Sequence, residues 1–213
     1  MRCLALTLAT GCIVAKQTLP VQPDNVTTVA LVTGGLPRPI EDVARHPWFA
    51  VRHAGDPSWT VYDFDGEHER ADPLDNKPYI EPIVQAVWRG DDADRAAACI
   101  EANHREIRHD VDRHFWLIPG PNCNTYGDRM LRRCGLHASL PATSIGKDWR
   151  GWIGAGITTE GTGVQLETAV LGLEIGLKEG IEVHVLGLSF GVDFWPPAII
   201  LPLGPGRLGF ADR

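Results

Sequence analysis

Apolar and polar residues alternate in the last third of the chain, and this pattern most limits the folds that the sequence can adopt. Between residues 181 and 185, Ile, Val and Val alternate with Glu and His, which is the two-residue period of a strand with one buried face. The apolar stretches 164–177 and 181–194 are joined by Lys-Glu-Gly at 178–180. We therefore predict a glycine-rich β-hairpin that turns at these three residues.

The size and composition of the chain predict one domain. Its 213 residues are 44% hydrophobic and 22% charged, enough to bury a sizeable core. We assign residues 26–213 to this domain, with residues 196–209 extended along it. The net charge of -7 excludes nucleic acid and anionic lipid surfaces as partners, because both require clustered Lys and Arg.

Local patterns predict an α+β fold in which helices pack on an antiparallel sheet. Charged residues interrupt every long apolar run, so we expect no membrane-spanning helix. The predicted helix is 91–109, with an exposed loop at 66–79. The predicted strands are 26–32, 48–52, 59–64 and a short one at 115–118, of which 48–52 and 59–64 form a hairpin.

The N-terminal residues carry an export signal. Leu8-Ala9-Thr10-Gly11-Cys12 reads like a bacterial lipobox, with Cys12 as the residue that is acylated. Residues 1–25 would then be signal, lipobox and tether. We expect a protein of the periplasm or cell envelope, attached to the membrane only through the lipid on Cys12. The alternative is a misassigned start and a cytoplasmic protein.

One cysteine stands where a loop of helix breakers turns into a short amphipathic helix. Pro119-Gly120-Pro121-Asn122 precedes Cys123, and the helical pattern runs to Cys134. Unpaired N–H groups and the positive dipole end favour an anion at a helix start, so we expect the pKa of Cys123 to be lowered. The alternative is a buried, inert cysteine beside an Asn cap.

The remaining cysteines do not predict a disulfide framework. Once Cys12 is lipidated and the leader with Cys3 is removed, an odd number of thiols remains, namely Cys99, Cys123 and Cys134. Cys123 and Cys134 would lie roughly 16 Å apart on one helix, too far for a bridge. Cys134, followed by Gly135 as a left-handed cap, is interpreted as a small buried hydrophobe.

A thiol nucleophile needs a nearby base, and His46 at the start of a strand is the candidate. His53 lies seven residues further and points to the opposite face of a regular strand. His104, His109 and His114 are spread around a helix by their five-residue spacing. No Cys or His pairing has zinc-site spacing, so we expect neither a metal nor another cofactor.

Six ordered motifs resemble an uncharacterised bacterial family, the domain of unknown function numbered 3750, and the resemblance runs from about Ala30 to Gly209. Many members of that family have Ser at the position of Cys123 and keep the His. The motifs are His46-Pro-Trp-Phe-Ala-Val-Arg, Trp59-Thr-Val-Tyr, Pro119-Gly-Pro-Asn-Cys-Asn-Thr-Tyr, Leu140-Pro-Ala-Thr-Ser-Ile-Gly-Lys-Asp-Trp149, Gly161-Thr-Gly-Val-Gln-Leu166 and Leu186-Gly-Leu-Ser-Phe-Gly191.

A histidine that opens a strand, followed later by Asn-Cys opening a helix, is similar to the circularly permuted papain-like enzymes of the lecithin:retinol acyltransferase type. This resemblance implies that Cys123 attacks an acyl or amide carbonyl, that His46 takes and returns its proton, and that the Cys123 N–H holds the oxyanion. It implies a lipid, peptide or other small-molecule ligand in a cleft. Orienting or oxyanion candidates are His53, Tyr62, Asp63 and Asn122.

The alternative function is a catalytically silent binding or structural protein of the envelope. A family that accepts Ser at the cysteine position can keep the fold and lose the chemistry. Asn122, Asn124 and Thr125 would then cap the helix, with residues 145–149 folded against it. In this interpretation the Lys147-Asp148 pair within that loop is structural.

Overall fold

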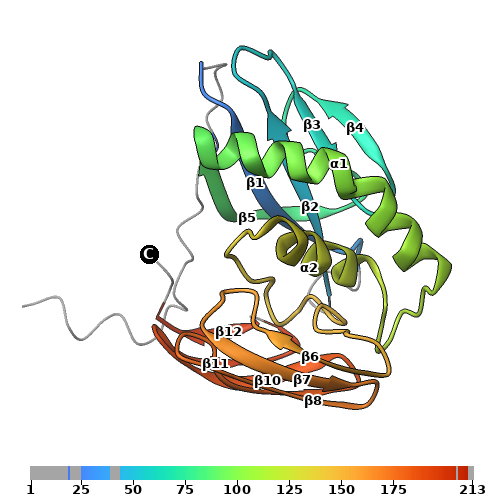
Figure 1. Cartoon of the computed structure of the whole chain (residues 1–213), viewed down its shortest axis with the longest axis vertical. Coiled ribbons are helices and arrows are strands. Elements are labelled where there is room, and N and C mark those ends of the chain that lie inside the picture. The colour runs from blue at the N-terminus through green and yellow to red at the C-terminus, as the bar shows by residue number, and fades with distance from the viewer. Residues whose placement is uncertain (1–18, 20–24, 39–43, 205, 211–213) are drawn as a thin grey trace, which may run out of the picture.

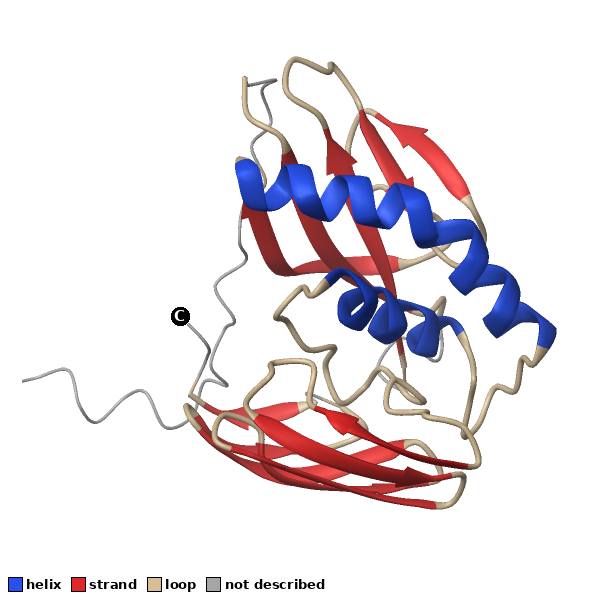
Figure 2. Cartoon of the chain, viewed as in Figure 1, coloured by secondary structure: helices blue, strands red, loops and turns tan. Residues whose placement is uncertain are grey.

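The computed structural model describes residues 19, 25–38, 44–204 and 206–210, and within them it contains two antiparallel sheets and two helices (Figures 1 and 2). The first sheet has the strand order β4-β3-β2-β1-β5. Its strands are β1 (Thr28–Gly35), β2 (Arg45–Arg52), β3 (Trp59–Tyr62), β4 (Glu67–Arg70) and β5 (Ile80–Arg89). The predicted hairpin of β2 and β3 is confirmed by their antiparallel pairing.

The two helices cover one face of the first sheet. Helix α1 (Asp91–Arg113) buries Ala96, Ala97 and Ile100 against that face, and α2 (Cys123–Cys134) packs beside it. Phe49 of β2 belongs to the same core as the helices, because odd-numbered β2 residues point toward them. The opposite face has a separate core, which includes Trp48 and Ala50.

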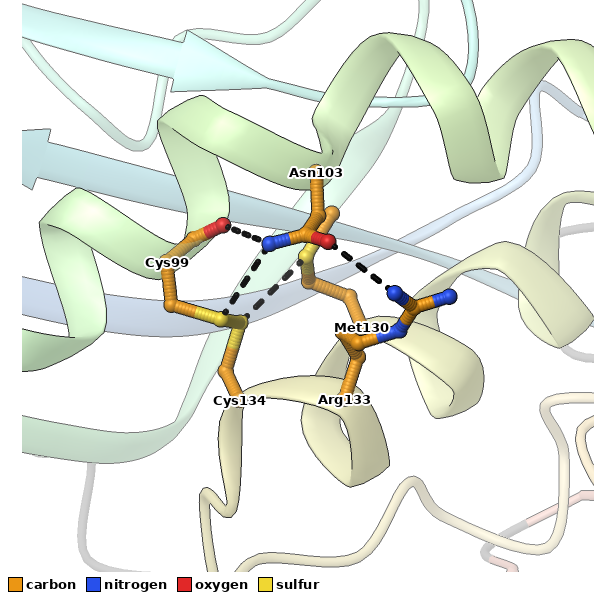
Figure 3. Close-up of a disulfide and its surroundings, with 5 residues drawn as sticks. All are labelled: Cys99, Asn103, Met130, Arg133 and Cys134. Carbon is orange, nitrogen blue, oxygen red and sulfur yellow. Dashed lines mark hydrogen bonds between the residues drawn. A yellow bond between two sulfur atoms is a disulfide. The ribbon is translucent and has the colours of Figure 1, made fainter.

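A disulfide between Cys99 and Cys134 ties α1 to the end of α2 (Figure 3). Asn103 braces it by donating to the Cys99 carbonyl at 2.8 Å, and Arg133 in turn donates to Asn103. The interpretation of Cys134 as a reduced buried hydrophobe is therefore wrong. Among the described cysteines, Cys123 alone is a free thiol, which also accounts for the odd count.

The C-terminal part of the chain forms a seven-stranded sheet. The predicted hairpin of two strands is therefore only part of a larger sheet. The turn at residues 178–180 is correct, since β8 and β9 pair with Gly176 opposite Gly180. The strands are β6 (Ile153–Ile157), β7 (Gly163–Thr168), β8 (Leu171–Gly176), β9 (Gly180–Val185), β10 (Leu188–Phe194), β11 (Pro197–Ile200) and β12 (Arg207–Gly209), each beside its neighbour in sequence.

The two faces of this second sheet are inverted relative to an ordinary half-buried sheet. In β9, Glu182 and His184 are buried, whereas Ile181, Val183 and Val185 are exposed. The same holds in the central strands, because the outward residues of β7, β8 and β10 are also mainly apolar, whereas β11 buries Ala198 and Ile200. We call the outward residues of β6–β12 the apolar face. Its exposed members include Val164, Leu166, Leu171, Leu173, Ile175, Ile181, Val183, Val185, Phe190, Val192 and Phe194.

Three local predictions need correction. The segment 66–79, expected to be an exposed loop, contains β4 and ends in Tyr79, whose ring packs beside the second core. Residues 115–118 are irregular rather than a strand. The first helix extends to Arg113, four residues beyond its predicted end.

The mixed α+β class is confirmed, with helices on one face of an antiparallel sheet. No helix in the described residues is long and apolar enough to cross a membrane. Cys12 and the rest of the predicted lipobox lie outside the described residues.

Candidate functional site

The start of α2 is built by a complete side-chain cap. The side-chain oxygen of Asn122 accepts the backbone N–H groups of Asn124 and Thr125, and Thr125 Oγ1 accepts the N–H of Asn122 at 3.1 Å. This capping box satisfies N–H groups that a helix start leaves open. At the other end, Gly135 adopts φ 62° as the predicted left-handed cap. Cys123 is therefore fixed as the first helical residue.

The loop at residues 145–149 folds against this cap. The amide nitrogens of Asn122 and Asn124 both donate to the Ile145 carbonyl at 2.9 Å, and Thr125 Oγ1 donates to the Gly146 carbonyl at 2.7 Å. A Cβ on Gly146 would lie 2.5 Å from the Asn122 amide nitrogen. The polar side chains around Cys123 thus join two loops to the helix start.

Helix α2 touches β2 at a glycine. A Cβ on Gly127 would lie 2.7 Å from Pro47 Cγ, so only glycine allows this approach. Cys123 lies one turn before Gly127 on the same helix face. This contact brings the partly exposed thiol toward the N-terminal end of β2, which carries His46.

His46 points to the other face of the sheet. It shares the even-numbered face of β2 with Trp48, and its ring stacks on Tyr79 with centroids 3.9 Å apart. The imidazole is buried, and its Nε2 has no hydrogen-bond partner among the described residues. The structure thus brings Cys123 and His46 to one end of the sheet without a bond from Nε2 to the thiol.

Tyr79 and Asp65 connect the two candidates. The Tyr79 hydroxyl donates to Asp65 Oδ2 at 3.3 Å, and burial, Asp65 and Cys123 all raise the pKa of Tyr79. Tyr79 also lines an open groove of about 830 Å³ along residues 72–82. Sequence reasoning missed Tyr79 because it ends the stretch 66–79, which is interpreted as an exposed loop, and Asp65 because it directly precedes that stretch.

The electrostatics hold both candidates neutral. Burial raises the pKa of the Cys123 thiol to about 12, with the N–H of Asn124 opposing this and Asp65 adding to it. The predicted lowering of this pKa is therefore wrong, because desolvation outweighs the helix start. Burial lowers the pKa of His46 to about 4, although Asp65 acts in the opposite direction. At neutral pH the site holds a thiol and an uncharged imidazole.

The residues proposed to orient His46 are engaged elsewhere. His53 Nε2 lies 2.7 Å from Glu101 on the helix-covered side, the face opposite His46 as predicted. Tyr62 packs edge-on against His104. Asp63 accepts N–H groups of the following turn and the amide of Asn76 at 2.8 Å.

Both polar atoms of the Asn122 side chain also have hydrogen-bond partners. Its amide nitrogen donates to the carbonyls of Leu117 and Ile145, and its oxygen caps the helix. An oxyanion would have to break one of these bonds to be held by this side chain. The backbone N–H of Cys123 remains the other oxyanion donor implied by the papain-like resemblance.

A second polar cluster lies between the second sheet and the loop at residues 143–150. Asp148, Glu174 and His184 are buried and place one ligand atom each within 4.8 Å of one another. Lys147 Nζ binds Asp148 at 2.9 Å within it, in keeping with a structural pair. Sequence reasoning missed this cluster because Glu174 and His184 lie on separate strands and Asp148 lies in a loop distant from both in the sequence.

The comparisons with known proteins assign a family without an activity. No curated protein and no solved structure matches the chain. Residues 35–149, more than half of the chain, match the family described as "Protein of unknown function (DUF3750)". The matched region runs from the end of β1 through His46, α1 and Cys123 to the loop that braces the helix start. This chain is a member of the DUF3750 family.

Proposed function

We propose that this protein is a thiol hydrolase or acyltransferase of the permuted papain-like kind, which acts on an acyl or amide carbonyl. The observation that carries the proposal is the buried Nε2 of His46, which lacks a partner near the capped helix start that presents Cys123. A buried polar atom without a partner costs about 1–3 kcal/mol. An uncharged imidazole nitrogen of this kind is suited to taking a proton from a thiol.

The proposed reaction begins from the neutral pair. The Cys123 S–H bond breaks, its proton moves to His46 Nε2, and the sulfur forms a bond to the carbonyl carbon. The bond to the leaving group then breaks, and the leaving group takes the proton from His46. Water or another acceptor attacks the thioester and releases Cys123. In the resting protein, His46 Nε2 makes no hydrogen bond to the Cys123 thiol. Substrate that enters through the groove beside Tyr79 would bring the imidazole and the thiol together.

The proposal includes export to the cell envelope of a bacterium, with a lipid anchor on Cys12. The disulfide between Cys99 and Cys134 supports it, because such bonds persist mainly in oxidising compartments. Radiolabelled fatty acid should appear on the wild-type protein and disappear in Cys12→Ala. Unlabelled wild-type protein in the soluble cytosolic fraction would contradict the anchor.

A catalytically silent binding or structural protein is the second candidate. The raised pKa of Cys123 and the lowered pKa of His46 favour it, since proton transfer between them is uphill in the resting state. The helix cap favours it as well, because Asn122, Asn124 and Thr125 beside Cys123 all bond the carbonyls of the loop at residues 145–149.

An acyl-transfer experiment separates the two candidates. The protein is incubated with p-nitrophenyl butyrate, and the acyl adduct is measured by intact mass and peptide mapping. We expect one adduct on Cys123, none in Cys123→Ala, and at least 100-fold slower acylation in His46→Gln.

The matched control is His53→Gln, a histidine beside the same strand that pairs with Glu101 and should acylate like wild type. An adduct that forms equally fast in His46→Gln and His53→Gln would contradict the proposed base. Absence of any Cys123 adduct, in protein whose thiol still reacts with iodoacetamide under denaturing conditions, would favour the silent binding protein.

A further inference from the structure

The strongest unexplained feature outside the thiol region is the buried cluster around His184. Its Nε2 lies 3.5 Å from Asp148 Oδ2 and 3.5 Å from Glu182 Oε2. Glu174 completes the group on the neighbouring strand, with a carboxylate oxygen within 4.8 Å of the Asp148 and His184 ligand atoms. The side chains come from β8, β9 and the loop before β6, so the fold rather than the local sequence assembles them.

Two buried atoms of this cluster make no hydrogen bond to any described residue, although they lie within ion-pair distance of each other. Nε2 of His184, a residue only 2% exposed, and Oε2 of Glu182 make no hydrogen bond in the described part of the chain. Leaving such a group unsatisfied costs about 1–3 kcal/mol. Because Glu182 and His184 are two residues apart on the same face of β9 and these atoms lie 3.5 Å apart, a single bound cation would contact both.

A hydrogen bond at Nδ1 fixes the orientation of the His184 imidazole. His184 Nδ1 hydrogen-bonds Glu167 Oε1, and Gln165 Nε2 donates to the same oxygen at 2.9 Å. This leaves Nε2 as the atom turned toward Asp148 and Glu182. A carboxylate that holds the far nitrogen of a histidine is the usual outer arrangement of histidine metal ligands.

Cations already lie in this network. Lys147 Nζ lies 2.9 Å from Asp148 Oδ2 and 3.9 Å from Glu182 Oε2. Burial lowers the pKa of His184, but Asp148, Glu167 and Glu182 outweigh it and raise that pKa to about 10. A metal ion at His184 Nε2 would therefore take the place of a proton there, because a ligating imidazole is neutral.

Glycines on neighbouring strands make space for the acidic side chains. A Cβ on Gly172 would lie 1.8 Å from Glu167 Oε2, and one on Gly191 would lie 2.7 Å from Glu182 Cγ. Each glycine stands directly opposite the acid in the strand register. The sheet is thus shaped to hold these carboxylates.

We propose that Asp148, Glu174, Glu182 and His184 bind one divalent transition-metal ion, such as zinc, between the second sheet and the loop before β6. One imidazole nitrogen and carboxylate oxygens are a ligand set that zinc accepts. Four protein ligands are typical of a structural site, so the ion would fasten the sheet to the loop. The site is independent of the thiol proposal.

The test uses the full chain after chelator treatment and dialysis, titrated with zinc chloride in a calorimeter. We expect one ion per chain and a higher melting temperature, with at least 10-fold weaker binding in Glu174→Gln. The matched control is Glu179→Gln, a buried glutamate of the same sheet that bonds Thr162 instead. Absence of saturable binding, or equal affinity in the two variants, would overturn the proposal.

A second measurement uses the protein with all four proposed metal-binding residues unchanged. Ring-nitrogen NMR of the unaltered protein should show one buried histidine whose Nε2 resonance shifts with zinc while its Nδ1 stays protonated. His184→Gln identifies that resonance by its loss. If zinc shifts only resonances that disappear in variants of exposed histidines such as His53 and His137, the binding is superficial and the proposed site is wrong.

Discussion

The imidazole of His46 lies flat against the phenol ring of Tyr79, with ring centroids 3.9 Å apart and planes 5° from parallel. The stack covers a base that burial keeps uncharged. Its lowered pKa has a measurable consequence for stability.

His46 should make the protein less stable in acid. Its folded pKa is about 4, against about 6.5 in the unfolded chain, so the unfolded state binds more protons between these values. The contribution is fully present above pH 6.5 and is lost as the pH falls toward 4, by about 3 kcal/mol. Urea unfolding at several pH values should show this loss in wild type and a smaller one in His46→Gln. Parallel curves for the two proteins would contradict the lowered pKa.

Cys123 should behave as an unactivated thiol in the resting protein. Because its pKa is about 12, the thiolate fraction should rise about tenfold per pH unit between pH 6 and 10. Iodoacetamide should label Cys123 at neutral pH more slowly than it labels free cysteine, with no plateau up to pH 10. A plateau near pH 7 would show an activated thiolate instead.

Replacing Gly34 should disturb the stack of His46 on Tyr79 by steric crowding, with both ring side chains unchanged. Gly34 pairs with His46 across the sheet, and a Cβ there would lie 2.8 Å from Tyr79 Cβ and 2.9 Å from Trp48 Cζ3. We expect Gly34→Ala to lower the free energy of unfolding by about 1–3 kcal/mol. Gly156→Ala is the control, since its Cβ would meet nothing within 4 Å. Equal stability of the two variants would contradict the tight packing.

The disulfide should stabilise the helical layer strongly. Cys99 and Cys134 are 35 residues apart, for which closing the loop in the unfolded chain is worth about 4 kcal/mol. Cys99→Ala with Cys134→Ala should lose that amount in denaturant unfolding, whereas Cys123→Ala in the intact disulfide background should lose much less. A double variant as stable as wild type would argue that the bridge does not form.

The apolar face should bind an apolar dye in the native state. Contiguous exposed apolar surface of this extent is rare in soluble monomers. We expect anilinonaphthalene sulfonate to fluoresce with native protein and the signal to fall in Leu173→Lys with Val183→Lys, two neighbours in the strand register. Trp116→Gln, an exposed aromatic outside this sheet, should leave the signal nearly unchanged. A signal that depends on Trp116 instead would place the dye elsewhere.

The sequence predicted the elements whose boundaries are set by capping and turn residues within a few positions. Asn122, the breakers before it and Gly135 after Cys134 bounded α2 correctly, because caps act within a few residues of the helix ends. The β2–β3 hairpin followed from its turn residues in the same way. The position of Cys123 at the helix start was therefore predictable, as was the strand position of His46.

Non-local relationships were not predictable. The alternation in β9 gave the period of a strand but not which face is buried, and here the polar face packs inward. The pairing of Cys99 with Cys134 depends on how α1 and α2 lie together. The pKa of Cys123 depends on burial by neighbours that the local sequence does not specify. Tyr79 reaches His46 from a segment whose polar composition resembles a loop.

The inverted faces of the second sheet have a thermal consequence. The contact between this sheet and the rest of the chain includes hydrogen bonds of polar and charged side chains, such as Arg132 with Gln165 and Ser189 with Asp148. Exposing polar surface lowers the heat capacity, whereas exposing apolar surface raises it. Detachment of the sheet would therefore add little positive heat capacity, or even a negative change, while melting of the five-stranded half would carry most of the positive change measured by calorimetry.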